Sequence, residues 1–172
     1  MESVELALRV GDYLLLEPAG KGSFGQVFKA VLFKNALDAG VVCIQEVDGK
    51  DRVVYRNKLV SATLPRFAVK RLRDRTRQEE FVLERDSCER LRLLQHPNVV
   101  KAFDASQTGD THFVVMEFID GQDLTKMVLA RGPLPAPEAC EVVRQAALGL
   151  HHAFDAGLVH RDIKPSHILV GR

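Results

Sequence analysis

The sequence of 172 residues lacks several features that would assign it to a class at once. Its three cysteines are an odd number without a Cys-x-x-Cys pair, so we expect reduced intracellular thiols and no disulfide framework. Lys and Arg number 24 against 23 Asp and Glu, which excludes the broad positive field of a nucleic-acid or anionic-membrane partner. No apolar run approaches the roughly 18 residues of a membrane-spanning helix, and the acidic start at 1–5 is unlike a signal peptide. A soluble, cytoplasmic domain without a membrane segment is therefore predicted.

The sequence does contain enough apolar residues, 46%, to enclose a hydrophobic core at this length. Short β-favouring runs occupy 13–17, 26–31, 41–47, 52–55, 67–70, 99–103 and 112–119. Apolar residues spaced by three and four predict helices over 78–94 and 135–154, and a loop after the second helix ends in a short strand at 168–170. The layout predicts an α+β fold in two lobes, the first β-rich with one helix and the second helical.

A glycine-rich motif lies between the first two predicted strands. Residues 20–27, Gly-Lys-Gly-Ser-Phe-Gly-Gln-Val, fit the pattern G-x-G-x-x-G-x-V. A dinucleotide site would continue into a helix, whereas a loop that folds over phosphates continues into a strand. The run 26–31 favours the strand, and the absence of Cβ atoms lets backbone N–H groups approach phosphate oxygens.

A second chemical motif follows the long predicted helix. Residues 160–165, His-Arg-Asp-Ile-Lys-Pro, concentrate charge in one loop between apolar residues. Asp162 suits a group that accepts a proton from a hydroxyl, and Lys164 suits one that holds a phosphoryl oxygen.

The sequence contains four motifs, at 20–27, 67–70, 96–98 and 160–165. Together they resemble a eukaryotic-like (Hanks-type) serine/threonine protein kinase, and they follow one another in the same order as in that family. The resemblance implies a two-lobe kinase fold, ATP and Mg²⁺ as cofactors, and a protein substrate with a Ser or Thr acceptor. Residues 1–172 would be a partial kinase domain. Its expected parts are an N-lobe and hinge at 11–119 with an insertion at about 31–66, and the start of an incomplete C-lobe at 120–172.

The resemblance also implies roles for individual residues. Asp162, Lys164 and Lys70 would be catalytic, with Asp162 as the base and Lys70 on the α- and β-phosphates. The ATP site would be formed by Gly20, Lys21, Gly22, Ser23, Phe24, Gly25, Val27, Ala68, Lys70, Glu84, Met116, Glu117 and Ile119. In that set Met116 would guard the inner pocket, and the backbone of the last two residues would pair with adenine.

The family's helix carries a glutamate that pairs with the strand lysine, and two positions compete for this role. Counting from Phe81 selects Glu84, whereas the usual spacing back from His96 selects Ser87. The two positions lie one helical turn apart. We favour Glu84, because a carboxylate can form the ion pair with Lys70 and a hydroxyl cannot.

Three departures from the family pattern bear on activity. His167 stands where the family has an Asn that binds Mg²⁺, and imidazole nitrogen is a poor ligand for so hard an ion, so weakened metal binding is expected. The insertion at 31–66 carries an Asp-Gly hairpin, and we favour a passive excursion over a docking surface. No Asp-Phe-Gly occurs, so the fragment is expected to be inactive, as a piece of a kinase truncated after the catalytic loop. The alternative is a nucleotide-binding or scaffolding pseudokinase.

Overall fold

The computed structural model describes residues 5–22, 25–47, 49–56, 62–72, 86 and 89–171. The chain divides into two compact units, each with its own internal contacts. Unit 1 consists of residues 1–88 and 103–118, and unit 2 consists of residues 89–102 and 119–172.

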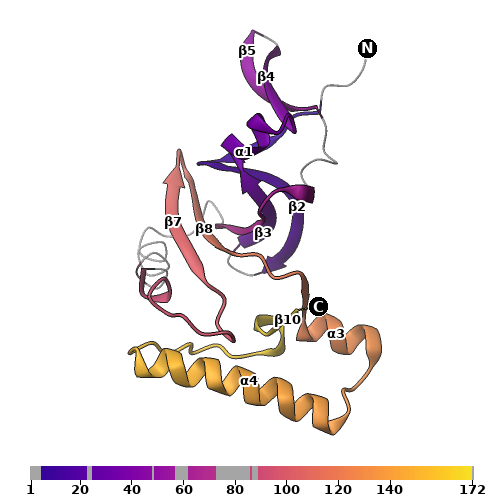
Figure 1. The fold of residues 1–172 in the computed structure, drawn as a ribbon, viewed down its shortest axis with the longest axis vertical. Helices are drawn as coiled ribbons and strands as arrows, with labels where there is room; N and C mark the ends of the chain where they lie inside the picture. The colour runs from indigo at the N-terminus through magenta and orange to yellow at the C-terminus, as the bar shows by residue number, and fades with distance from the viewer. Residues whose placement is uncertain are drawn as a thin grey trace. The chain divides into compact units, whose positions relative to one another are not determined.

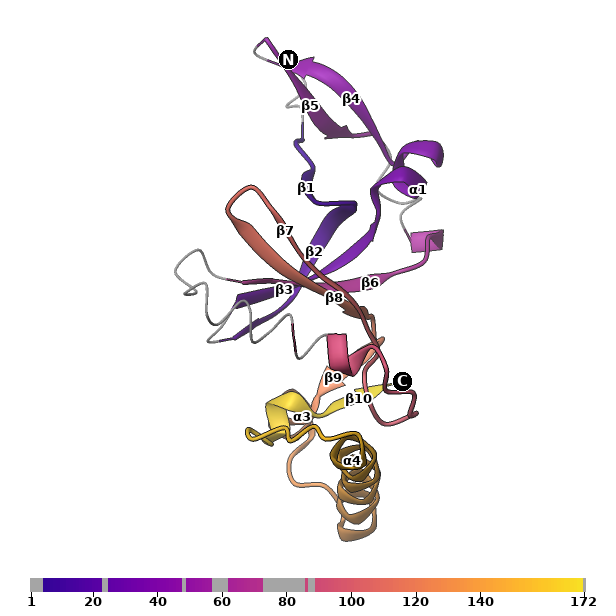
Figure 2. The ribbon, with the colours of Figure 1, turned by 90° about the vertical axis from the view of Figure 1, so that its left-hand side faces the viewer.

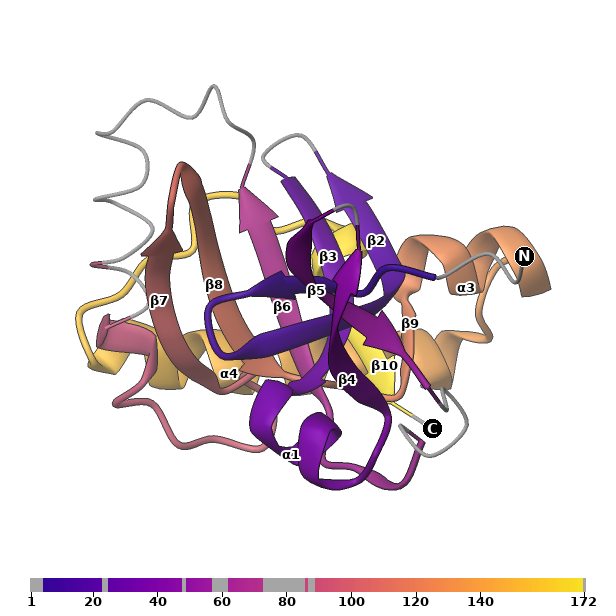
Figure 3. The ribbon, with the colours of Figure 1, turned by 90° about the horizontal axis from the view of Figure 1, so that it is seen from above.

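Unit 1 is built on a six-stranded antiparallel sheet (Figure 3). In spatial order its strands are β1 (Leu8–Val10), β2 (Tyr13–Gly22), β3 (Gly25–Leu32), β6 (Phe67–Leu72), β8 (Thr111–Glu117) and β7 (Ala102–Thr108). The strands predicted at 13–17, 26–31 and 67–70 are confirmed, and each extends beyond its prediction. The strand predicted at 99–103 is wrong in position, because pairing begins only at Ala102 and the preceding residues form a turn.

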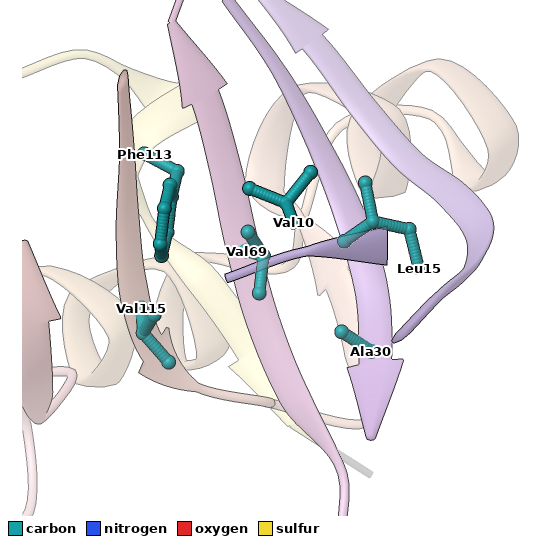
Figure 4. Close-up of a cluster of buried hydrophobic side chains, with 6 residues drawn as sticks. All are labelled: Val10, Leu15, Ala30, Val69, Phe113 and Val115. Carbon is teal, nitrogen blue, oxygen red and sulfur yellow. The ribbon is translucent and has the colours of Figure 1, made fainter. Parts of the chain in front are cut away.

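One face of this sheet carries the main hydrophobic core of unit 1 (Figure 4). The buried side chains are Val10, Leu15, Ala30, Val69, Phe113 and Val115. At the edge of this cluster, the Phe67 ring packs edge-on against Tyr13 at 5.4 Å and against Phe103 at 5.6 Å between centroids. Burial of these large side chains holds strands from distant parts of the sequence in one register.

The predicted insertion forms a helix and a hairpin that belong to a second core. Helix α1 (Phe33–Asp38) precedes the hairpin of β4 (Val42–Val47) and β5 (Lys50–Tyr55), which confirms the predicted hairpin (Figure 2). The buried members of this second core are Leu14, Val31, Phe33, Ala36, Val41 and Val42. Residues 5–7 extend the hairpin sheet, since the Ala7 amide donates to the Val53 carbonyl at 2.9 Å. The insertion is therefore packed into unit 1 rather than appended to its surface.

From residue 119 on, the described part of unit 2 contains two short strands, two α-helices and a helical turn (Figure 1). In chain order these are β9 (Gly121–Asp123), α3 (Leu124–Arg131), α4 (Ala136–Asp155), the 3-10 turn η2 (Pro165–His167) and β10 (Leu169–Gly171). Asp123 caps α3, because its carboxylate accepts from the Lys126 amide at 2.9 Å. Pro135 precedes α4 and Gly157, with φ of +78°, follows it, as the sequence predicts.

The apolar face predicted for the long helix, from Ala139 to Phe154, is narrower than expected. Val143 and Phe154 are 63% and 65% exposed, whereas Gly149 is buried. The predicted positions 139, 142, 146 and 150 are half-buried, and the less exposed side of the helix also includes 149, 152 and 153. Among the described residues no helix is long and apolar enough to cross a membrane.

The helix predicted over 78–94 falls mostly outside the described residues. Asp86 and residues 89–91 are helical, and the helix has ended before His96, as predicted from the proline that follows.

Candidate functional site

Four of the predicted ATP-site residues lie on one face of the unit 1 sheet. Val27 of β3 is the direct partner of Lys70 in β6, and Ala68 of β6 is the direct partner of Met116 in β8. Directly paired residues project to the same face, and side chains two apart on a strand do so as well. Val27, Ala68, Lys70 and Met116 therefore share a face, and the core residue Val69 lies on the other.

The glycine-rich loop lies at the end of the β2–β3 hairpin beside this face. Gly20 pairs with Val27, and Gly22 pairs with Gly25, which confirms the predicted hairpin. Lys21 is exposed and pairs with Gln26. Ser23 and Phe24, the tip of the predicted loop, lie outside the described residues.

Two glycines of this loop have different surroundings. A Cβ added to Gly25 would lie 2.2 Å from the backbone oxygen of Arg71, so β6 approaches too closely for a side chain. A Cβ added to Gly20 would meet nothing within 4 Å. The backbone of β6 thus leaves no room for a side chain at Gly25, whereas the protein leaves open space at Gly20.

The competition between Glu84 and Ser87 for a place opposite Lys70 stays open, since both positions lie outside the described residues. The predicted hinge residues fall on either side of a unit boundary, with Glu117 ending β8 in unit 1 and Ile119 opening the second segment of unit 2.

The predicted catalytic loop lies in unit 2 between α4 and β10. Its far end is held by the β9–β10 pair, in which Leu169 is the partner of Asp123, and by the Leu124 amide, which donates to the Ile168 carbonyl at 2.9 Å. A 3-10 turn closes the loop, with the His167 amide donating to the Lys164 carbonyl at 2.9 Å. These contacts bring residues 162, 164 and 167 together.

The carboxylate of Asp162 is paired with the side chain predicted to act beside it. Lys164 Nζ lies 2.7 Å from Asp162 Oδ2, and both side chains are about half exposed. The hydrogen bond from Lys164 is the main cause that lowers the pKa of Asp162, and the nearby charges of Lys164, His167 and His160 lower it further. Asp162 is therefore ionised at neutral pH and ready to accept a hydrogen bond from a hydroxyl.

His167 also contacts Asp162, through the backbone. Its Nδ1 lies 2.8 Å from the Asp162 carbonyl oxygen, and its ring lies 5.7 Å from that of His160. The sequence pattern contained no indication of this hydrogen bond, because it depends on the 3-10 turn that returns the chain toward residue 162.

Two further loop residues were not among the predicted site residues. Arg161 has φ of +63°, which makes it the single described residue other than glycine with positive φ. Such a conformation costs about 1–2 kcal/mol for a residue with a Cβ, and strain of this kind concentrates at functional loops. His160 Nδ1 accepts a hydrogen bond of 3.3 Å from the amide of Asp162. The two residues preceding Asp162 thus shape the loop around it.

Replacing Lys164 by Met is expected to raise the pKa of Asp162 toward the ordinary value of an aspartic acid. The reason is that the substitution removes both the hydrogen bond and the positive charge that favour the carboxylate. The pKa can be followed by the side-chain carboxyl 13C shift in NMR. The control is Lys126→Met, which removes a lysine paired with a different aspartate, Asp123. An Asp162 pKa unchanged in the Lys164 variant would contradict the described pair.

Comparison with known proteins agrees with the fold and the motif order. Residues 13–172 match the protein kinase domain family, and the chain belongs to it. The chain is 32% identical over 170 residues to the serine/threonine-protein kinase ATG1a of Arabidopsis thaliana, and 34% identical over 160 residues to the serine/threonine-protein kinase PknE of Mycobacterium tuberculosis. These matches cover 99% and 93% of this chain, but only 22% and 24% of the relatives.

Two solved structures place the chain within the kinase fold. The kinase domain of Mycobacterium tuberculosis PknI superposes with a TM-score of 0.69 at 20% identity, over 98% of this chain and 58% of that one. The structure of Rad53 residues 1–466 in complex with AMP-PNP superposes with a TM-score of 0.66 at 26% identity, over 94% of this chain and 35% of that one. The predicted two-lobe kinase fold is confirmed, and the chain corresponds to the N-terminal part of such domains.

The protein kinase family generally uses ATP and Mg²⁺. The side chains of the loop at 160–167 can therefore be compared with the ligands that Mg²⁺ prefers. Mg²⁺ prefers six oxygen ligands in tight octahedral geometry. Asp162 offers carboxylate oxygen, but position 167 offers an imidazole, whose Nδ1 is already engaged with the Asp162 carbonyl. The ligand set at position 167 therefore does not fit Mg²⁺.

Proposed function

We propose that this chain is the N-terminal part of an enzyme that transfers the γ-phosphoryl group of ATP to Ser and Thr hydroxyls of proteins. The observation that carries the proposal is the pairing of Asp162 with Lys164 in the loop that follows α4. A carboxylate held ionised beside an ammonium group combines a proton acceptor with a charge that stabilises a phosphoryl oxygen.

In the proposed reaction, Asp162 orients the acceptor hydroxyl and receives its proton as the oxygen attacks the γ-phosphorus of ATP, and the bond from that phosphorus to the leaving ADP breaks. Lys164 stabilises negative charge on the transferred group as a point charge. The exposure of both side chains supports this proposal, because a protein substrate has to reach them directly.

For ATP, the proposed site is the sheet face that carries Val27, Ala68, Lys70 and Met116. The apolar side chains would contact adenine, with Met116 guarding the inner pocket, and Lys70 would contact the α- and β-phosphates. The open space at Gly20 supports close approach of the phosphates to the loop backbone. The Rad53 structure, a complex with AMP-PNP, supports nucleotide binding in a related chain.

We propose further that this chain by itself does not catalyse phosphoryl transfer. It contains no Asp-Phe-Gly, the motif whose aspartate holds the catalytic metal in the family. The second candidate, a nucleotide-binding pseudokinase or scaffolding module, is favoured by one specific observation, the imidazole at position 167. A protein substrate and a cytoplasmic location stay predictions.

Replacing Lys70 by Met is expected to weaken ATP binding by about 10–100-fold, because a hydrogen bond to a charged group contributes about 1.5–3 kcal/mol. Binding is measured with a fluorescent ATP analogue titrated into the purified chain. Lys50→Met is the matched control, since Lys50 is exposed in the insertion hairpin and lies on a different sheet.

Equal affinities of the Lys70 and Lys50 variants, or no binding by the wild-type chain, would contradict the proposed ATP site. Phosphorylation of a Ser/Thr peptide by the chain with Mg²⁺ and ATP would contradict the proposed lack of turnover. Nucleotide binding without turnover in a longer polypeptide that includes Asp-Phe-Gly would favour the pseudokinase.

A further inference from the structure

The aromatic ring of Phe118 lies against two positively charged side chains of unit 1. Lys29 Nζ lies over the ring at 5.5 Å from its centroid, and Arg66 Cζ lies over it at 5.7 Å. A cation within about 6 Å of a ring centroid is attracted by the negative face of the ring. Because Phe118 directly follows Glu117, the last residue of β8, these contacts hold the chain at the point where the strand ends.

A carboxylate lies beside the same cations. Lys29 Nζ donates to Glu17 Oε1 at 2.8 Å, and the Lys29 side chain is only 22% exposed. This hydrogen bond is the main cause that lowers the pKa of Glu17, and the charges of Lys29 and Arg66 lower it as well. Glu17 is therefore ionised at neutral pH and offsets the repulsion between the two cations over one ring.

A bulge in β2 brings this carboxylate into place. The register of β2 against β3 shifts by one residue between Leu15 and Glu17, so that Glu17 becomes the direct partner of Lys29. Without the shift Leu16 would stand opposite Lys29, and it has no charge to offer. The Tyr55 hydroxyl, which belongs to the insertion hairpin, donates to the Leu15 carbonyl at 3.0 Å and so contacts the strand at the bulge.

The end of the insertion makes a second contact in the same neighbourhood. Leu64 packs against the second core, and Arg66 follows two residues later, directly before β6. Arg66 is exposed, so charge rather than burial keeps its guanidinium over the ring. The insertion therefore contacts the strand bulge through Tyr55 and the Phe118 ring through Arg66.

We propose that four side chains of unit 1 form a brace that positions the backbone of Glu117 for the adenine base: Glu17, Lys29, Arg66 and Phe118. They are positioning residues, because they act on the backbone and not on the reacting atoms. The brace itself is a property of the chain without ligand, whereas its effect on adenine rests on the proposed function. The insertion then supports the nucleotide site and is more than a passive excursion.

NMR of the chain without nucleotide tests the brace, because protons over the face of an aromatic ring are shifted upfield. The ε-protons of Lys29 and the δ-protons of Arg66 are expected upfield of those of solvated side chains. The shifts are expected to be lost in Phe118→Leu and kept in Phe118→Tyr, which retains the ring. Circular dichroism verifies the fold of each variant, and the exposed Arg66 keeps the test decisive if a Phe118 variant unfolds.

Amide hydrogen exchange at 116–118 tests whether the brace orders the backbone. Exchange is expected to be about two- to fivefold faster in Lys29→Met and Arg66→Met, the factor that corresponds to losing one exposed cation–π contact. Arg66→Lys retains a cation and is expected to restore most of the protection. The matched control is Lys34→Met, which removes an exposed lysine of α1 and is expected to leave exchange unchanged.

Titrations with adenosine and with ATP separate the base from the phosphates. Lys29→Met and Arg66→Met are expected to weaken binding of both ligands by the same factor of about two to five, since the brace acts on the backbone that meets the base. Lys70→Met is expected to weaken binding of ATP alone, because adenosine has no phosphate. Lys34→Met is expected to bind both ligands as the wild type does.

Absence of the upfield shifts from the wild type, or wild-type exchange in both cation variants, overturns the brace. Lys29 is the direct partner of Ala68, on the proposed nucleotide face. Weaker nucleotide binding in the Lys29 variant but not in the Arg66 variant would therefore indicate direct contact with the nucleotide and overturn the positioning role. Faster exchange in a chain that binds neither ligand would support the brace but overturn the proposed function, and ATP binding with unaltered exchange would do the reverse.

Discussion

Replacement of Gly25 by alanine is expected to lower the free energy of unfolding of unit 1 by about 2–4 kcal/mol, through overpacking and loss of a strand hydrogen bond. The added Cβ would lie 2.2 Å from the Arg71 carbonyl oxygen and 3.1 Å from the Leu72 Cα. These are backbone atoms of the paired strand β6, so no side-chain rotation can relieve the contact. The β3–β6 pair has to separate at this end.

The matched control is Gly20→Ala in the same hairpin. The Cβ at Gly20 meets nothing within 4 Å, so stability should stay within about 0.5 kcal/mol of the wild type. Urea unfolding measures the free energy, and hydrogen exchange of the β3 and β6 amides locates the change. Equal stability of the two variants would show that β6 does not constrain Gly25.

The pair of variants also separates two roles within one glycine motif. Under the proposed function, Gly20→Ala weakens ATP binding in a chain that remains stable, because only a ligand needs the space at that position. The Gly25 variant is expected to lose binding together with the strand pairing. A nucleotide titration on the stable variant is therefore the informative measurement.

Replacement of Gly149 by alanine is expected to destabilise unit 2 by about 1–3 kcal/mol, the usual cost of overpacking. Gly149 lies in the middle of α4, where a Cβ would be 2.5 Å from the Asn98 carbonyl oxygen. The loop before β7 is held against the helix at this level, since Asn98 Nδ2 donates to Gln145 Oε1 at 3.1 Å. The His96 and His152 rings are also stacked there, at 5.2 Å between centroids.

Helix propensity alone would predict the opposite effect of the Gly149 substitution on stability. An alanine in a helix interior is about 1 kcal/mol more favourable than a glycine, so a free helix would become more stable. Ala147→Gly, at an exposed position, measures that propensity in the same helix. Thermal and urea unfolding followed by helical circular dichroism decide the outcome, and a stabilised Gly149 variant would show that α4 and the loop are not in close contact.

Local pattern was sufficient to predict several of the strands and the long helix. Strands β2, β3 and β6 followed from β-favouring runs bounded by turn residues, and α4 followed from its proline start and glycine stop. Helix α1 was missed because its six residues have no capping side chain and no acidic first turn. It exists because Phe33 and Ala36 are buried in the second core.

The strand predicted at 99–103 is a second case in which tertiary packing, rather than local pattern, decides the structure. Val99 and Val100 are β-favouring, yet the Val99 amide donates to the His96 carbonyl in a turn at 3.1 Å. This turn lies against α4 at Gly149, and such packing overrides local propensity. The strand begins only at Ala102, from where it joins β8 in the sheet.

Within the candidate site, the amino-acid types and their order along the chain were enough to indicate the family and its chemistry. The sheet register then placed Val27, Ala68, Lys70 and Met116 on one face, because pairing partners are distant in sequence. The substitution of an asparagine by His167 was visible as a departure, but not its consequence. Only the 3-10 turn brings Nδ1 to the Asp162 carbonyl. Residue identity sets which donors exist, and three-dimensional packing decides which of them remain open to a ligand.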